Sequence, residues 1–213
     1  MTAEDLILVI PEKSDVERDA VADAWCRSGG AVTRIGRFWD PPPLERTAVR
    51  LYGNETFCLV LAQKLGLELV SPADDLILAA PATVLRRAIR RVRLGDTSPD
   101  MFPTFAEPIV PKQFAAGVFP DLDALAGATV GLSPDVELIV SGTVDFVAEA
   151  RAFVLDRTVR ACATYEGEGD LSQATRLVQN VIDSVPLPDT AVVDVGLLPG
   201  GDWALVELNA AWG

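Results

Sequence analysis

The first 72 residues alternate between short apolar runs and longer mixed stretches. Four apolar runs are typical of buried strands, at residues 5–11, 31–38, 48–53 and 67–72. Two mixed stretches predict helices, at residues 14–30 and 54–66. The first begins with Ser-Asp, either of which can cap a helix, and ends at Gly-Gly, and the second begins with Asn54 as its cap. Strands that alternate with helices predict a small parallel α/β domain.

Residues 73–100 differ in character and are predicted to form a helical connector. The sequence DDLILAAPATVLRRAIRRVRLG is expected to end in a helix. This predicted helix carries five arginines, namely Arg86, Arg87, Arg90, Arg91 and Arg93. The arginines either form a solvated face, or one or two of them face an anionic ligand.

Residues 101–213 mix strands and helices. The stretch VELIVSGTVDF at 136–146 predicts a strand, a turn and a second strand. The stretch at 149–165 predicts two strands around a turn at residues 156–157. An amphipathic helix is expected at 171–185, because its apolar residues lie on one side.

The last segment, at residues 190–209, has the pattern of a β-hairpin. Two apolar, β-rich runs are separated by PGGD at 199–202. A symmetric turn centred on the two glycines places Leu198 opposite Trp203. The same register places Asp194 opposite Glu207, and Asn209 lies on the same face because strand side chains alternate.

The facing carboxylates of Asp194 and Glu207 predict a cation between them. Like charges directly opposite each other on paired strands are destabilising. Together with Asn209 they offer only oxygen ligands, which favours Mg²⁺, or Mn²⁺ as the other choice. The alternative is a solvated polar face, as many antiparallel sheets have. The other side chains of this face are largely apolar, which favours the metal site.

Composition excludes several classes of chemistry. The chain of 213 residues contains no histidine, which rules out Ser-His or Cys-His nucleophile pairs and His-ligated zinc. Its net charge of −13 argues against nucleic-acid backbones and anionic lipids as partners. Three widely spaced cysteines give neither a disulfide framework nor a zinc signature, so a reducing cytoplasm is expected. The apolar runs are too short for a membrane span.

Three segments in a fixed order resemble the ATP-grasp superfamily. The sequence VVDVGLLPGGDWALVELN resembles the magnesium hairpin of that family. FPTFAEPIVPKQFAAGVF resembles its first ATP-binding strand and mobile phosphate loop. VSGTVDFVAEARAFVLD resembles the adenine hinge followed by a strand with an acidic-x-Arg motif. Together the segments cover about residues 102–213, and the α/β region before them looks like a compact N-terminal subdomain of the family.

The resemblance implies an ATP-grasp fold that combines α/β and α+β parts. Residues 1–72 would form the N-terminal subdomain and 73–100 the connector, and in 101–213 two α+β subdomains would clasp ATP. The implied reaction is an ATP- and Mg²⁺-dependent ligation of a carboxylate to an amine or similar nucleophile through an acyl phosphate, releasing ADP and phosphate. A non-catalytic nucleotide-binding protein and a small-molecule kinase are the alternatives. A small-molecule or peptide substrate is implied, and a homodimer is left open.

The resemblance also assigns roles to individual residues. Metal ligation falls to Asp194, Glu207 and Asn209. The nucleotide pocket would use Phe105, Ile109, the hinge residues Ser141, Gly142, Thr143 and Val144, and the small-residue loop ending at Gly117. Lys112 would contact phosphate, with a plain surface lysine as the alternative.

Catalysis would rest on Arg151, with Lys112 balancing the phosphate charge. Arg151 would meet the γ-phosphate or the acyl phosphate, because its planar fork of donors suits such groups. Glu149 would orient Arg151, with a simple cross-strand ion pair as the alternative.

Two positions depart from the family pattern. The pair at 107–108 is Glu-Pro where Lys-Pro is common in the family. Gly142 stands where the hinge often carries an acidic residue. A carboxylate beside a phosphate is unfavourable. The missing positive charge is therefore expected from Lys112 or from one of Arg86, Arg87 and Arg90.

Overall fold

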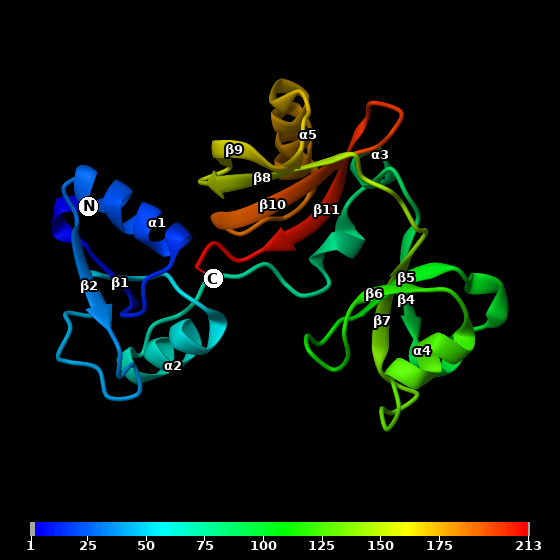
Figure 1. Cartoon of the computed structure of the whole chain (residues 1–213), viewed down its shortest axis with the longest axis horizontal. Helices are drawn as coiled ribbons and strands as arrows, with labels where there is room; N and C mark the ends of the chain where they lie inside the picture. The colour runs from blue at the N-terminus through cyan, green and yellow to red at the C-terminus, as the bar shows by residue number, and fades with distance from the viewer. Residues whose placement is uncertain (1–2, 213) are drawn as a thin grey trace. The chain divides into compact units, whose positions relative to one another are not determined.

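The computed structural model describes residues 3–212, and the chain divides into two compact units (Figure 1). Unit 1 comprises Met1–Val70 together with Ala211–Gly213, and unit 2 comprises Ser71–Ala210. The backbone therefore passes between the units twice, after residue 70 and after residue 210. No helix in the described part of the chain is long and apolar enough to cross a membrane.

Unit 1 is built around a parallel sheet of three strands in the order β2-β1-β3. The strands are β1 (Ile7–Pro11), β2 (Ala31–Ile35) and β3 (Val49–Leu51), preceded by the short turn η1 (Ala3–Asp5). Helix α1 (Val16–Arg27) packs Ala22 on one sheet face, and α2 (Glu55–Leu65) packs Phe57 and Leu61 on the other. The predicted parallel α/β unit is confirmed.

The helix caps of unit 1 follow from its sequence, but one predicted strand is absent. Asp15 accepts hydrogen bonds from two backbone amides of α1, and Asn54 accepts one from Phe57 N at 3.0 Å. The segment at 67–72, predicted as a strand, pairs with no other strand of the described residues. Leu67 and Leu69 pack against the α2 side of the core, so their alternation marks a half-buried extended segment without a ladder.

The first sheet of unit 2 has four antiparallel strands in the order β4-β7-β5-β6. They are β4 (Ile89–Arg93), β5 (Thr104–Pro108), β6 (Gly117–Phe119) and β7 (Glu137–Ser141). Helix α4 (Leu122–Ala128) buries Leu125 against one face of this sheet. Four short helical elements lie before β5: η2 (Leu76–Ala79), α3 (Ala82–Leu85), η3 (Leu94–Asp96) and η4 (Pro99–Met101).

The predicted arginine helix at the end of the connector is wrong. Helix α3 ends at Leu85, and Arg86 adopts a left-handed backbone with φ of 54°. The following arginines lie on the edge strand β4, whose backbone pairs with β7. The connector therefore supplies a strand to the first sheet of unit 2.

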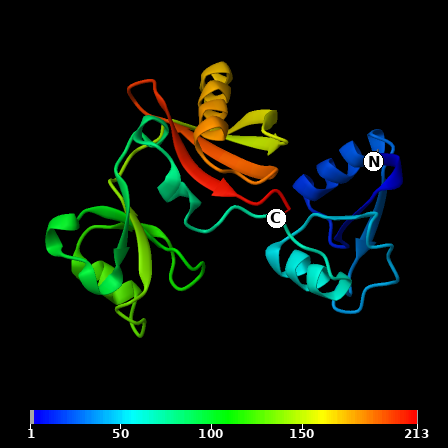
Figure 2. The ribbon, with the colours of Figure 1, turned by 180° about the vertical axis from the view of Figure 1, so that it is seen from behind.

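The second sheet of unit 2 also has four antiparallel strands, in the order β11-β10-β8-β9. They are β8 (Ala148–Leu155), β9 (Thr158–Gly167), β10 (Thr190–Leu197) and β11 (Trp203–Asn209). Helix α5 (Leu171–Ser184) covers one face of the sheet (Figure 2). The predicted turn at 156–157 and the predicted helix are confirmed. The second strand expected within 136–146 is instead a loop leading to β8.

The β10–β11 hairpin has a different register at its tip from the one predicted. Leu197, not Leu198, faces Trp203, and the ladder shifts by one residue between Asp194 and Val195. This β-bulge leaves Val206 as the extra residue of β11. The shift offsets the error at the tip, so that Asp194 faces Glu207 as predicted.

Candidate functional site

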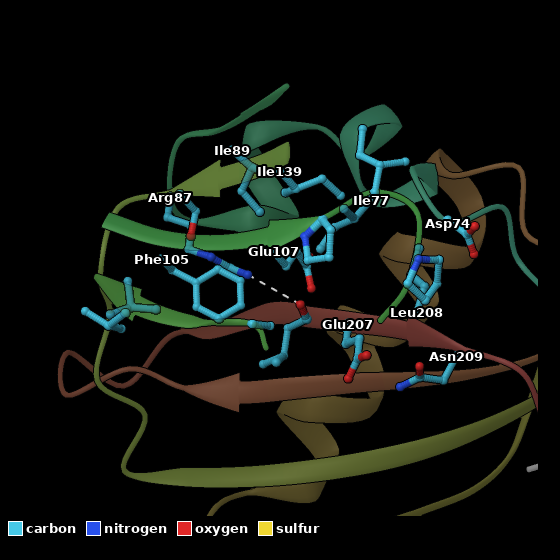
Figure 3. Close-up of a pocket in the computed structure, with 18 of the residues that line it drawn as sticks. Asp74, Ile77, Arg87, Ile89, Phe105, Glu107, Ile139, Glu207, Leu208 and Asn209 are labelled. Atoms are coloured by element: carbon cyan, nitrogen blue, oxygen red, sulfur yellow. Dashed lines mark hydrogen bonds between the residues drawn. The ribbon is translucent and has the colours of Figure 1, made fainter. Parts of the chain in front are cut away.

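A cavity of about 580 Å³ lies in unit 2 between the first sheet and strand β11 (Figure 3). Phe105 and Glu107 line it from β5, whereas Glu207 and Asn209 line it from β11. Of the residues predicted for the nucleotide and the metal, those that line the cavity are Phe105, Ile109, Lys112, Ser141, Gly142, Thr143, Val144, Glu207 and Asn209. The structure thus brings most of the predicted set together.

The hinge after β7 forms an apolar end of the cavity. Ser141 O accepts a hydrogen bond from the Thr104 hydroxyl at 2.9 Å, and Gly142 N donates to Ala88 O at 3.4 Å. These bonds fix the start of the hinge. Thr143 and Val144 have no backbone–backbone hydrogen bond to other residues within 3–212, so their peptide groups are available to a ligand. The neighbouring walls are apolar and come from Ile89, Phe105 and Ile139.

Three charged residues face one another at the other end of the cavity. Burial raises the pKa of Glu107, and the nearby Glu207 carboxylate raises it further, while the Arg87 guanidinium acts in the opposite direction. Burial in turn lowers the pKa of Arg87, against the attraction of Glu107. Among residues 3–212, the carboxylates of Glu107 and Glu207 have no hydrogen-bond partner. This end of the cavity therefore holds polar groups that a ligand can engage.

Arg87 is the arginine of the cluster that lies beside Glu107. Arg86 instead approaches Asp202 at 3.9 Å, and Arg91 contacts both Asp75 and Glu137. Of the alternatives considered for the positive charge, Arg87 and Lys112 line the cavity formed by the described residues, and Arg86 and Arg90 do not.

The phosphate-loop residues lie on one side of the cavity. Lys112 follows Pro111, is exposed, and has a left-handed backbone with φ of 68°. Gly117 begins β6 and pairs with Ala106, so it fixes the end of the loop and does not itself line the cavity among the described residues.

Asp194 and Arg151 form an ion pair outside the cavity lining. Arg151 donates from Nε to Oδ1 and from Nη2 to Oδ2 of Asp194, both at 2.8 Å. The Asp194 side chain is 2% exposed, whereas the Arg151 side chain is 47% exposed. The hydrogen bonds to Asp194 raise the pKa of Arg151. Asn209 Nδ2 also approaches Asp194 Oδ2, at 3.4 Å.

Glu149 has a different partner from the one predicted. It accepts a hydrogen bond from the Tyr165 hydroxyl and forms no ion pair with Arg151. The Arg151 Cζ atom lies 5.5 Å from the centre of the Tyr165 ring. Burial and the bond to Glu149 raise the pKa of Tyr165. Arg151 is therefore held by Asp194 and Tyr165, and Glu149 acts on it only through the tyrosine.

The predicted metal ligands fit Mg²⁺ in their chemistry. Glu207 and Asn209 present carboxylate and amide oxygens at the cavity wall, and oxygens are the ligands that Mg²⁺ prefers. The carboxylate of Asp194 is shared with Arg151, so it reaches a cation only beside or in place of that guanidinium. Among the described residues, no three side chains of the types His, Cys, Asp and Glu cluster closely enough to hold a metal by themselves. Asn209 is thus an essential member of the predicted set.

One contact at this site was missed by sequence reasoning although a signal for it exists. Phe146 lies against Gly196 of β10, where a Cβ atom would come within 2.3 Å of the ring. A glycine inside a strand often marks such a close approach. Phe146 also packs beside Arg87, whose Cζ atom is 6.0 Å from the ring centre.

Comparison with known proteins supports the interpretation of the fold. Residues 84–213 match a family model described as an ATP-grasp domain, the second family of one clade of that domain. No curated protein is significantly similar to the chain. A RimK domain protein ATP-grasp from Sphaerobacter thermophilus has a similar structure, with a TM-score of 0.60, 15% identity, and coverage of 98% of this chain and 92% of that one.

Two further structures show the same likeness. D-cycloserine synthetase DcsG has a TM-score of 0.60 and 12% identity, with 98% of this chain and 92% of that chain covered. The ligase PsnB, in a complex with a precursor variant, Mg and ADP, has a TM-score of 0.53 and 13% identity, with 99% and 89% covered. Identities this low concern the fold alone, and they confirm the predicted ATP-grasp architecture.

Proposed function

Because the chain belongs to the ATP-grasp domain family, we propose that it is an ATP- and Mg²⁺-dependent ligase. The reaction would join a carboxylate to an amine or similar nucleophile through an acyl phosphate, with release of ADP and phosphate. One observation carries the proposal: a single cavity combines an apolar end at the hinge with an end that holds Arg87, Glu207 and Asn209.

The apolar end suits a nucleotide base. Phe105 and Ile139 would pack on the base, and the peptide groups of Thr143 and Val144 would supply hydrogen bonds. Backbone recognition of this kind needs no acidic side chain, which accommodates glycine at position 142.

The charged end suits a triphosphate with its metal. Glu207 and Asn209, with Asp194 beside them, would hold Mg²⁺, which neutralises phosphate charge when bound. Lys112 would follow the phosphates from its loop. The half-exposed guanidinium of Arg151 would stabilise the acyl phosphate with donors that point away from Asp194. Catalysis would thus consist mainly of positioning and charge neutralisation.

The structural neighbours suggest the kind of substrate. PsnB is described in complex with a precursor, Mg and ADP, and DcsG is described as a D-cycloserine synthetase. A small molecule or a peptide that carries a carboxylate or an amine is therefore the substrate class we propose.

The test is an ADP-release assay on the full chain with Mg²⁺, ATP and pools of carboxylates and amines. We expect turnover that depends on both Mg²⁺ and a substrate pool. Glu207→Gln should reduce it by about a hundredfold or more, because one charged ligand at the phosphates is lost. The matched control Glu68→Gln changes an exposed carboxylate of unit 1 and should retain full activity. Equal activity of wild type and Glu207→Gln would contradict the metal assignment.

A nucleotide-binding protein without catalysis is the second candidate. The observation that favours it is the face-to-face placement of Glu107 and Glu207, which repels phosphate unless a cation intervenes. Thermal stabilisation by ATP with Mg²⁺, combined with no ADP release from any substrate pool, would support this candidate over the ligase.

A further inference from the structure

Arg87 makes a set of contacts that no role in nucleotide binding requires. Its Nη1 atom donates to Leu205 O at 2.5 Å and to Leu85 O at 3.1 Å, and its Nη2 atom lies 3.4 Å from Val206 O. Two of these three carbonyls belong to β11. The side chain thus ties the start of the first sheet to the last strand of the second sheet within unit 2.

The two β11 carbonyls lie at the β-bulge. The ladder pairs Val195 with Leu205 and Asp194 with Glu207, so Val206 has no partner residue on β10. A bulge disrupts the ladder locally and leaves backbone groups in need of other partners. Arg87 supplies those partners at Leu205 and Val206.

The bulge decides which face of the sheet Glu207 occupies. Leu205 packs on the side of α5, and strand side chains alternate, so residue 207 of a regular β11 would point to that same side. The extra residue at Val206 shifts the alternation by one. As a result Glu207 and Asn209 lie at the cavity, whereas Leu208 packs against the α5 core and only borders the cavity.

Arg87 itself is held in place from several sides. Its Cζ atom lies 6.0 Å from the Phe146 ring centre, and that ring lies against Gly196 of β10. Glu107 faces its charge from β5. Figure 3 shows Arg87 beside Phe105, with its hydrogen bond toward the β11 backbone drawn as a dashed line. Such a fixed guanidinium is suited to hold another element, because little conformational freedom remains to be lost.

We infer that Arg87 is a positioning residue that fixes the β11 bulge and thereby presents Glu207 and Asn209 to the cavity. The inference rests on the proposed function for its catalytic consequence, but its structural content is independent of it. It predicts that loss of Arg87 loosens residues 204–210 and weakens the use of Mg²⁺, although Arg87 is not itself a metal ligand.

The first test measures amide hydrogen exchange by mass spectrometry on the full chain. Arg87→Met should speed exchange in the peptide covering 204–210 by about tenfold or more, because two carbonyls of the bulge lose their donor. Arg93→Met is the matched control, since Arg93 is an exposed arginine of β4, and it should leave this peptide unchanged. Unchanged exchange in Arg87→Met would overturn the inference whether or not the protein is a ligase.

The second test removes the need for Arg87. Deletion of Val206 should restore a regular ladder while keeping Leu208 toward α5 and Glu207 toward the cavity. In the ADP-release assay, Arg87→Met should raise the Mg²⁺ concentration for half-maximal turnover by about tenfold. Adding the Val206 deletion should bring that concentration back toward the wild-type value.

The second test also separates positioning from direct binding. If Arg87→Met loses activity and a folded double variant does not regain it, Arg87 contacts the nucleotide directly and the inference fails. If the deletion variant does not fold, as judged by circular dichroism, the exchange rates of Arg87→Met and Arg93→Met decide alone. If wild type shows no turnover, the proposed function fails, and the exchange result still decides the role of Arg87.

Discussion

Unit 1 and unit 2 bury different kinds of side chain. Within residues 3–70 and 211–212, the buried side chains are apolar, with the Cys58 thiol as the most polar group. Unit 2 buries hydroxyl groups and the carboxylate of Asp194, and it partly buries Arg87 and Glu107 as well. Withdrawing charge from water is unfavourable unless a partner compensates, so these groups are a poor way to gain stability.

The difference indicates where stability and chemistry reside. Both units have apolar clusters that account for folding, but only unit 2 places charged groups around a cavity of about 580 Å³. Substitutions in the apolar core of unit 1 should therefore change the free energy of unfolding. Substitutions of the charges in unit 2 should change ligand binding and turnover more than stability, with one exception that follows from burial.

The largest loss of stability is expected for Phe57→Ala in unit 1. Phe57 is 1% exposed and packs between α2 and the parallel sheet. Its truncation should lower the free energy of unfolding by about 3–5 kcal/mol, measured by urea denaturation. Nucleotide affinity of the molecules that stay folded should be unchanged. A drop in affinity equal to that of the cavity variants would break the separation between the units.

The exception is the Arg151–Asp194 pair, for which the two partners should behave differently. Arg151→Met leaves the buried carboxylate of Asp194 without its main donors and should lower the free energy of unfolding by about 2–3 kcal/mol. Asp194→Asn keeps the shape of the side chain and leaves a half-exposed guanidinium, so the expected loss is only about 1 kcal/mol. Urea denaturation of both variants at pH 7 compares them, and equal losses would contradict the asymmetry in burial.

A smaller effect is expected at the helix cap of α2. Asn54→Ala removes the acceptor for Phe57 N and should lower the free energy of unfolding by about 1 kcal/mol. Asn54→Asp retains an acceptor and serves as the control. ADP release by both variants should equal that of wild type at a temperature where all are folded.

The smallest effect at neutral pH is expected from Cys58. Burial raises the pKa of its thiol from 9.0 to about 12, so the folded state holds this proton more tightly than the unfolded state does. The stabilisation is complete below pH 9 and is lost as pH rises toward 12, amounting to a loss of about 0.8 kcal/mol by pH 9.5. Urea denaturation at pH 8 and 9.5 measures it, and Cys58→Ala should remove this part of the pH dependence.

Much of the fold follows from local pattern, whereas its errors arise where tertiary pairing prevailed. Val84, Leu85, Ala88 and Ile89 recur at helical spacing, and arginine is a good helix former. Pairing with β7 nevertheless draws Ile89–Arg93 into a strand. Propensity is a weak prior of this kind, and the backbone partner that overrides it lies almost fifty residues away in sequence.

The candidate site was predictable on one wall and not on the other. The pairing of Asp194 with Glu207 could be read from the hairpin, although the predicted turn was off by one residue and the bulge offset the error. The contacts of Arg87 could not, because they join residues more than a hundred positions apart through the bulge. Glu149 was paired with Arg151 by sequence spacing, but Tyr165 on the neighbouring strand reaches Glu149 instead.

The most direct test of the central claim is calorimetric titration of the full chain with ATP, with and without Mg²⁺. Wild type should bind ATP at least about tenfold more tightly when Mg²⁺ is present, because the metal offsets repulsion between the phosphates and Glu207. In Asn209→Ala this gain should largely disappear while a weaker, Mg²⁺-independent affinity remains from the hinge end. The same ATP affinity with and without Mg²⁺, or no binding of millimolar ATP, would contradict the assignment of this cavity as a site for ATP and its metal.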